Sequence, residues 1–280
     1  MVPELRPRGI GEILDVAVAL YRAQFARLVA LAAIVVVPVQ ILTTLVLLSA
    51  QPDRITISAT GSTTVQSDTR SALTELAASL VVLFIGYVSN AFVIGVCARP
   101  AGDAYIGQDG VWKRGSVGGR GALAVLATAV IIALCEMLGL AFCGIGLFVA
   151  STWFAVAMPA VVLERVRPSA ALGRSFSLTK GYFWRVLGLV VTLQLLITVV
   201  NLGLTLGIRV WLLAGASTTA QVIAQGLASA ISGALTTPLL ATAAVALYFD
   251  MRIRREAFDV QLLLQRADAR AAPVMATPAQ

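Results

Sequence analysis

The sequence predicts an all-α integral membrane protein with six transmembrane helices. Three observations support this: few charges, six apolar stretches long enough to cross a bilayer, and basic residues gathered on alternate connections. Hydrophobic residues make up 59% of the 280 positions and charged residues 12%, whereas about a quarter of residues are charged in soluble domains. Helices are expected rather than strands, because the apolar stretches lack the alternating pattern of a membrane β-barrel.

Each stretch is judged by length, since a helix rises about 1.5 Å per residue and the hydrocarbon core is about 30 Å thick. Residues 121–163 carry one charge, Glu136, and are too long for one span, so we divide them into a hairpin that turns near residues 140–144. The first stretch follows 27 mixed residues, unlike the apolar core of a cleaved signal peptide, so we expect an uncleaved helix. The predicted spans are residues 28–49, 73–96, 121–139, 144–163, 186–208 and 220–248.

The basic residues predict the orientation of these spans. Eighteen of the 21 Lys and Arg lie in the two terminal segments and in the second and fourth connections, which leaves three for the other side. By the positive-inside rule, both termini are cytoplasmic. The same segments hold ten acidic residues, so they contain the whole positive excess of the chain. We interpret this excess as an orientation signal that also attracts anionic lipid headgroups, and we expect no binding of nucleic acid.

Two cytoplasmic segments, residues 9–25 and 167–185, have the pattern of amphipathic helices that lie in the membrane interface. A looser version occupies residues 111–122. Each precedes a pair of spans, so the chain is consistent with a parallel repeat of an interfacial helix followed by a transmembrane hairpin. All of this lies in a single membrane domain, residues 1–266, and residues 267–280 are expected to form a disordered cytoplasmic tail. The polar residues around the first amphipathic helix fall on one narrow stripe: Arg8, Glu12, Asp15 and Arg22.

The segments ALYRAQFARLV (residues 19–29) and SLTKGYFWRVL (residues 177–187) share the pattern Leu-x-[Arg/Lys]-x-x-Phe-x-Arg. Each stands where an expected interfacial helix meets a span. Cations at that point hold the end of the span in the cytoplasm, while aromatic rings bury at the boundary. The residues expected to contact lipid at this interface are Arg22, Phe25, Arg27, Lys180, Phe183, Trp184 and Arg185.

Three polar residues inside the spans form a candidate intramembrane site: Glu136, Asn90 and Asn201. Because a charge inside a bilayer is costly, Glu136 is a candidate for moving a proton or a substrate. The alternative is that Glu136 lies near the outer interface, where the cost falls, and that the amides make hydrogen bonds between helices. Pro38, Pro159 and Pro238 interrupt the apolar runs of the first, fourth and sixth spans. Such breaks can expose backbone groups to a ligand, and the commoner alternative is a simple kink.

The sequence contains no histidine, which excludes His-based acid–base catalysis, the usual zinc ligation and ligation of haem by His. It also shows no nucleophile-elbow, phosphate-binding or dinucleotide-binding motif and no carboxylate cluster. The three cysteines have no CxxC spacing, and we interpret them as small apolar residues, with a bridge between Cys135 and Cys143 left open. We therefore expect no catalytic residue, no metal site and no cofactor.

Three stretches carry a resemblance to a known family: RPRGIGEILDVAVALYRAQF (6–25), PAVVLERVRPSAALGRSFSLTKGYFWRVLG (159–188) and LYFDMRIRREAFDVQLL (247–263). They resemble uncharacterised multi-pass proteins, common in actinobacteria, that are related to the membrane domain of glycerophosphoryl diester phosphodiesterases. The resemblance implies a six-helix protein of the bacterial plasma membrane. Enzymes with that domain join it to a catalytic barrel that bears His and acidic residues, and this chain lacks histidine, so phosphodiesterase activity is not implied.

The leading functional hypothesis is therefore a non-enzymatic integral membrane protein. It would engage anionic lipid or a protein partner through its basic, amphipathic cytoplasmic face. The alternative is a small transporter or channel with a path near Glu136, Asn90 and Asn201.

Overall fold

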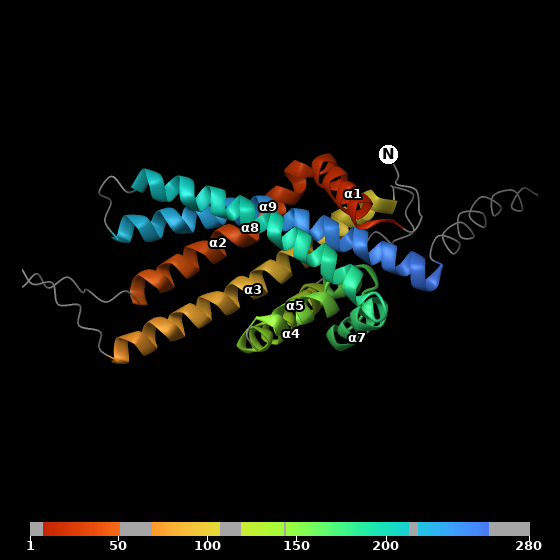
Figure 1. Cartoon of the computed structure of the whole chain (residues 1–280), viewed down its shortest axis with the longest axis horizontal. Helices are drawn as coiled ribbons and strands as arrows, with labels where there is room; N and C mark the ends of the chain where they lie inside the picture. Colours follow the sequence, from red (N-terminus) through yellow and green to blue (C-terminus); the bar gives the residue numbers. More distant parts are fainter. Residues whose placement is uncertain (1–7, 51–68, 107–118, 143, 213–217, 258–280) are drawn as a thin grey trace, which may run out of the picture.

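Nine α-helices make up the described part of the chain, which a computed structural model gives as residues 8–50, 69–106, 119–142, 144–212 and 218–257 (Figure 1). The described ranges contain no strand. In chain order the helices are α1 (Ile10–Ala23), α2 (Phe25–Ala50), α3 (Thr69–Ile106), α4 (Gly119–Ala141), α5 (Ile145–Trp153), α6 (Ala157–Leu163), α7 (Pro168–Thr179), α8 (Phe183–Leu212) and α9 (Thr218–Glu256).

Six helical segments of the described chain are long and apolar enough to cross a membrane: α2, α3, α4, α5 with α6, α8 and α9. The predicted all-α fold with six spans is confirmed, and the chain is an integral membrane protein. The helices run along the long axis of the molecule in Figure 1, and α1, α7 and the C-terminal end of α9 gather at one end. We call this the basic end. The opposite end holds the end of α2 and the starts of α3 and α9.

The second half of α9 forms the centre of the core. Its residues between Ala241 and Ile253 are nearly all buried, and α9 packs against α1, α2, α3 and α8. Near the basic end the rings of Tyr105 and Phe249 stack with their centroids 4.6 Å apart, which joins α3 to α9. The outer faces of the bundle expose large apolar side chains, as expected of surfaces in contact with lipid tails.

Helix α3 continues ten residues beyond the predicted end of its span, through Pro100 to Ile106. Two charged residues lower the hydropathy there, so the sequence predicted a connection. Instead this part of α3 packs tightly on α6, because a Cβ added to Gly102 would lie 2.9 Å from a methyl carbon of Leu163. Burial of the extra turns offsets the hydrogen bond that Pro100 cannot donate.

The fourth span is broken between α5 and α6, at residues 154–156. This break lies three residues before Pro159 rather than at the proline itself. Pro159 is the third residue of α6, where a backbone N–H has no partner within the helix, so proline is tolerated there. Helices α2 and α9 run without a break through Pro38 and Pro238, which leaves the simple kink as the alternative that applies to the first and sixth spans.

Glycine makes three tight places in the chain possible. Gly144, with a φ of 75°, closes the turn between α4 and α5 where the sequence predicted it, and Gly181, with a φ of 92°, turns α7 into α8. Beside the first turn, α4 and α5 touch through Gly139 and Gly146. A Cβ added to Gly139 would lie 2.5 Å from the carbonyl carbon of Gly146, so a larger residue would force the two helices apart.

Several predictions concern parts of the chain beyond the described residues. The expected tail, residues 267–280, and most of the amphipathic segment at residues 111–122 lie outside the described residues. The parallel repeat and the interfacial position of α1 and α7 also stay predictions.

Candidate functional site

Each copy of the shared motif spans the junction of a short helix with a long one. In the first copy, Leu20 is buried near the end of α1 and Phe25 begins α2. In the second copy, Leu178 is buried near the end of α7 and Phe183 begins α8. The leucine therefore fixes the short helix to the core, and the residues that follow mark the start of the long helix.

Five of the seven predicted lipid-contact residues are exposed at these junctions. We call them the aromatic–basic rim: Arg22, Phe25, Arg27, Lys180 and Trp184. Trp184 is 80% exposed, and the half-buried ring of Phe183 meets it edge to face with centroids 5.5 Å apart. Within the described part of the chain, none of the three rim cations lies in an ion pair. Aromatic rings beside cations are typical of the boundary between membrane and water.

Arg185, the last cation of the second motif, belongs to a buried group of charges. The carboxylate of Asp250 accepts hydrogen bonds from the backbone N–H of Arg8 at 2.8 Å and from the Arg185 side chain at 3.3 Å. It also accepts one from Arg254 at 3.0 Å. Both side chains donate in addition to the backbone carbonyl oxygen of Arg8. These four residues, the Asp250 cluster, join α8 and α9 to the chain that enters α1.

The Asp250 cluster corrects one prediction about Arg8. The sequence predicted Arg8 on the polar stripe of the first amphipathic helix, together with Asp15 and Arg22. Asp15 and Arg22 are exposed, but Arg8 is buried and precedes α1, with its guanidinium 5.9 Å from the centre of the Tyr105 ring. The prediction was wrong because Asp250 binds the backbone of Arg8 and draws it into the core.

A second group, the Glu164 cluster, joins α7 and α9 to the end of α6. The Glu164 carboxylate accepts hydrogen bonds from Arg174 at 3.0 Å and from the Tyr248 hydroxyl at 2.7 Å. Arg174 also pairs with Glu256. Arg252 donates to Glu256 at 3.0 Å and to the Tyr248 hydroxyl at 3.3 Å. The hydrogen bond to Glu256 raises the pKa of the Arg174 guanidinium above its ordinary value, so this cation stays charged.

Neither cluster was predicted from the sequence. The residues that meet are far apart in the chain: Arg8 and Asp250 are separated by 242 positions, and Glu164 and Tyr248 by 84. One sequence feature pointed to the Asp250 cluster. Asp250 lies within the apolar stretch LYFDM, residues 247–251. An acidic residue in such a place needs a buried cationic partner.

Two of the three predicted intramembrane polar residues line the same cavity. Glu136 and Asn90 line one cavity of about 140 Å³ between α3, α4, α5, α8 and α9, and Ser151 donates a hydrogen bond to Glu136 at 3.1 Å. Glu136 lies five residues before the end of α4, roughly 8 Å along the helix axis. Asn201 lies elsewhere and accepts a hydrogen bond from Ser232, which links α8 to α9. Of the two alternatives that the sequence left open, hydrogen bonding between helices therefore applies to Asn201.

Among the residues that the structure describes, no three Cys, Asp or Glu side chains gather as metal ligands would. Comparison of the chain with protein-family models, with curated proteins and with solved structures gave no match. The resemblance to the phosphodiesterase membrane domain therefore stays a prediction.

Proposed function

We propose that this integral membrane protein is non-enzymatic and binds anionic lipid headgroups through its aromatic–basic rim. The observation that carries the proposal is a difference between two sets of cations. Arg174, Arg185 and Arg254 are paired with carboxylates of the protein itself. Arg22, Arg27 and Lys180 are instead exposed, and two of the rim's members are aromatic rings.

Charge and apolar contact act together at the rim. Each Lys or Arg near an anionic bilayer surface contributes about 1 kcal/mol of binding free energy, and an interfacial Trp adds contact with the headgroup region. We no longer include Arg185 among the residues that contact headgroups, because its guanidinium already bonds Asp250 and the carbonyl oxygen of Arg8. Phe183 supports the ring of Trp184.

The proposal includes the orientation of the chain in a bacterial plasma membrane. Helix α1 and the C-terminal end of α9 lie at the same end of the bundle (Figure 1). The positive-inside rule assigns that basic end to the cytoplasm, with both termini on the same side. The rim then faces the leaflet that carries the negative surface potential, which favours anionic headgroups over neutral ones.

The proposal is tested by measuring which lipid the purified full chain retains. The triple variant Arg22→Gln, Arg27→Gln, Lys180→Gln removes three charges and keeps both rings. The wild-type chain is released from nanodiscs of phosphatidylglycerol and phosphatidylcholine, and its bound lipids are identified by native mass spectrometry. It should retain phosphatidylglycerol preferentially. Three additive contributions of about 1 kcal/mol predict a loss of preference on the order of 100-fold in the variant.

The matched control exchanges Arg22→Lys, Arg27→Lys and Lys180→Arg, and should keep the wild-type preference. The proposal fails if wild type retains both lipids equally, or if the glutamine variant prefers phosphatidylglycerol as strongly as wild type. Co-purification of one acidic protein in fixed ratio, without a lipid preference, would assign the rim to a protein partner instead.

A second candidate function is transport, and the observation that favours it is the cavity shared by Glu136 and Asn90. A carboxyl group in the membrane interior can bind and release a proton. Proton flux into proteoliposomes that stops in Glu136→Gln and survives in the triple rim variant would put transport ahead of lipid binding. Asn201 is not part of this path, since it bonds Ser232 between α8 and α9.

A further inference from the structure

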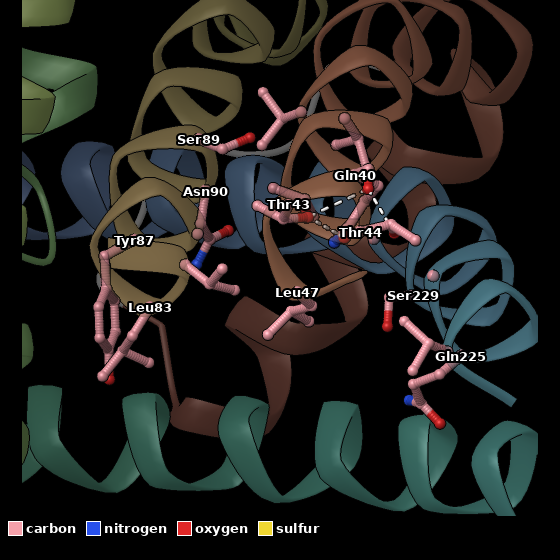
Figure 2. A pocket seen from close by; sticks show the side chains of 18 of the residues that line it. Gln40, Thr43, Thr44, Leu47, Leu83, Tyr87, Ser89, Asn90, Gln225 and Ser229 are labelled. Carbon is pink, nitrogen blue, oxygen red and sulfur yellow. Dashed lines mark hydrogen bonds between the residues drawn. The ribbon is translucent and has the colours of Figure 1, made fainter. Parts of the chain in front are cut away.

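A cavity of about 730 Å³ lies between α2, α3 and α9, within the membrane-spanning helices (Figure 2). Its lining comes from residues 36–47 of α2, 82–90 of α3 and 221–237 of α9. These stretches belong to the half of the bundle away from the basic end. Cavities that bind small molecules have volumes of about 300–1,000 Å³, so this space has the size of a ligand site rather than of a packing defect.

The lining is polar without being charged. Amide and hydroxyl side chains reach the cavity from all three helices, among them Gln40, Thr43, Ser89, Asn90, Gln225 and Ser229. No Lys, Arg, Asp or Glu stands among the described residues that line it. A charged ligand would find no counter-ion there, and desolvation of an ion costs several kcal/mol. A purely apolar ligand would leave the amides and hydroxyls without partners.

Asn90 supplies an independent sign of a missing partner. Its side-chain carbonyl oxygen is buried and has no hydrogen-bond partner among the residues that the structure describes. In Figure 2 the Asn90 side chain extends from α3 toward α2, across the cavity from Thr43. An unsatisfied buried acceptor costs about 1–3 kcal/mol, and an O–H donor on a ligand would remove that cost.

The opposite wall, on α2, offers a complementary set of groups. Thr43 donates its hydroxyl hydrogen to the side-chain oxygen of Gln40 at 3.0 Å, and Thr44 donates to the backbone carbonyl oxygen of Gln40 at 2.7 Å (Figure 2). These bonds use the hydroxyl hydrogens but leave oxygen lone pairs free, and the Gln40 amide still has N–H donors. The cavity therefore presents both donors and acceptors to whatever fills it.

We propose that this cavity binds an uncharged polyhydroxyl group, such as the sugar headgroup of a membrane glycolipid. Each hydroxyl of a sugar can donate to the Asn90 oxygen or accept from an amide N–H, which satisfies both kinds of group in the lining. Apolar residues such as Leu47 and Leu83 complete the wall and suit the non-polar face of a sugar or the start of a lipid chain. The site goes beyond the function proposed above, since it takes a neutral headgroup and lies in the other half of the bundle.

The first test measures retention of monogalactosyl diacylglycerol by the full chain in nanodiscs, with phosphatidylcholine as competitor. Ser229→Phe fills the cavity, and Asn90→Leu removes the unpaired acceptor. The control is Leu227→Phe on the same helix, because Leu227 is 61% exposed and does not line the cavity. Wild type and the control should prefer the galactolipid at least ten-fold by native mass spectrometry, and both cavity variants should lose that preference.

A second measurement uses a smaller change, so that misfolding of the filled variants does not decide the outcome. Ser229→Cys, in a chain whose own cysteines are replaced by alanine, is labelled with a maleimide in nanodiscs. Galactolipid should slow the labelling at least three-fold relative to phosphatidylcholine, and Leu227→Cys should show no such protection. Protection by dissolved methyl galactoside alone would identify the polyhydroxyl ligand as a free solute, whereas protection only by the lipid identifies a headgroup. Equal labelling under all conditions, with no galactolipid preference in wild type, would overturn the proposal.

Discussion

At the scale of single residues, the structure separates cations that are paired with carboxylates of the protein from cations that are exposed. Arg185 is held by the buried Asp250, while Arg27, which occupies the same position in the other copy of the motif, is exposed. What the two copies share is the start of a long helix at Phe25 and Phe183. The spacing shared by the two motifs therefore reflects the same kind of helix junction in both places, rather than two copies of a ligand site.

The stability of the basic end depends on Asp250, which bonds Arg8, Arg185 and Arg254. Asp250→Asn would leave Arg185 and Arg254 near each other without the carboxylate that they share. Removal of one partner from a fully buried pair costs about 3–5 kcal/mol. Since these arginine side chains are 24% and 21% exposed, we expect a loss of about 2 kcal/mol, seen as a lower midpoint of thermal unfolding in detergent.

The control for this change is Asp15→Asn, because Asp15 lies on the exposed side of α1. It should alter the free energy of unfolding by no more than about 0.5 kcal/mol. If Asp250→Asn unfolds at the wild-type temperature, the Asp250 cluster does not hold the basic end together.

At the scale of helices, the positions of the spans could be predicted from the sequence but their ends and breaks could not. Hydropathy over about 20 residues is a local property, so the spans were found where they lie. The extension of α3 to Ile106 depends on its contact with α6, and the break at residues 154–156 depends on packing around α5 and α6. Such contacts join distant segments and leave no local pattern.

The crossing of α4 and α5 gives the sharpest test at this scale. Gly139→Ala places a methyl group 2.5 Å from the Gly146 backbone, so it should destabilise the hairpin by about 1–3 kcal/mol, as overpacking does elsewhere. Gly203→Ala in α8 meets nothing within 4 Å and should be neutral, or stabilising by up to about 1 kcal/mol, because alanine favours helix. Thermal unfolding of the two variants in the same detergent checks the difference. Equal midpoints would mean that the two helices do not touch at glycine.

At the scale of the whole molecule, polar groups are sorted along the long axis. Helices α1 and α7 and the C-terminal end of α9, which contribute to the two charge clusters and the aromatic–basic rim, gather at the basic end (Figure 1). The uncharged cavity is lined by residues from the second half of α2, the middle of α3 and the first half of α9. The excess of basic residues on one side was visible in the sequence. Which of them are paired was not, because the pairing brings together residues as distant as Arg8 and Asp250. The same holds for the candidate site, where Glu136 and Asn90 line one cavity and Asn201 instead bonds Ser232.

This arrangement predicts different lipid contacts for the two leaflets. If the basic end lies in the cytoplasm as we propose, the rim would meet the anionic leaflet, and the neutral cavity would lie within the other half of the bilayer. The two proposals together therefore predict sensitivity to the headgroup composition of both leaflets.

The most direct test of anionic-lipid binding at the aromatic–basic rim is the quenching of Trp184 fluorescence by brominated lipid. The variant Trp112→Phe, Trp153→Phe, Trp211→Phe leaves Trp184 as the single tryptophan, and nanodiscs contain brominated phosphatidylglycerol or brominated phosphatidylcholine at the same mole fraction. Lipid binding at the rim predicts at least two-fold stronger quenching by phosphatidylglycerol, and loss of that excess when Arg22, Arg27 and Lys180 are changed to glutamine. Equal quenching by the two lipids, or an excess that survives the loss of the three charges, would contradict it.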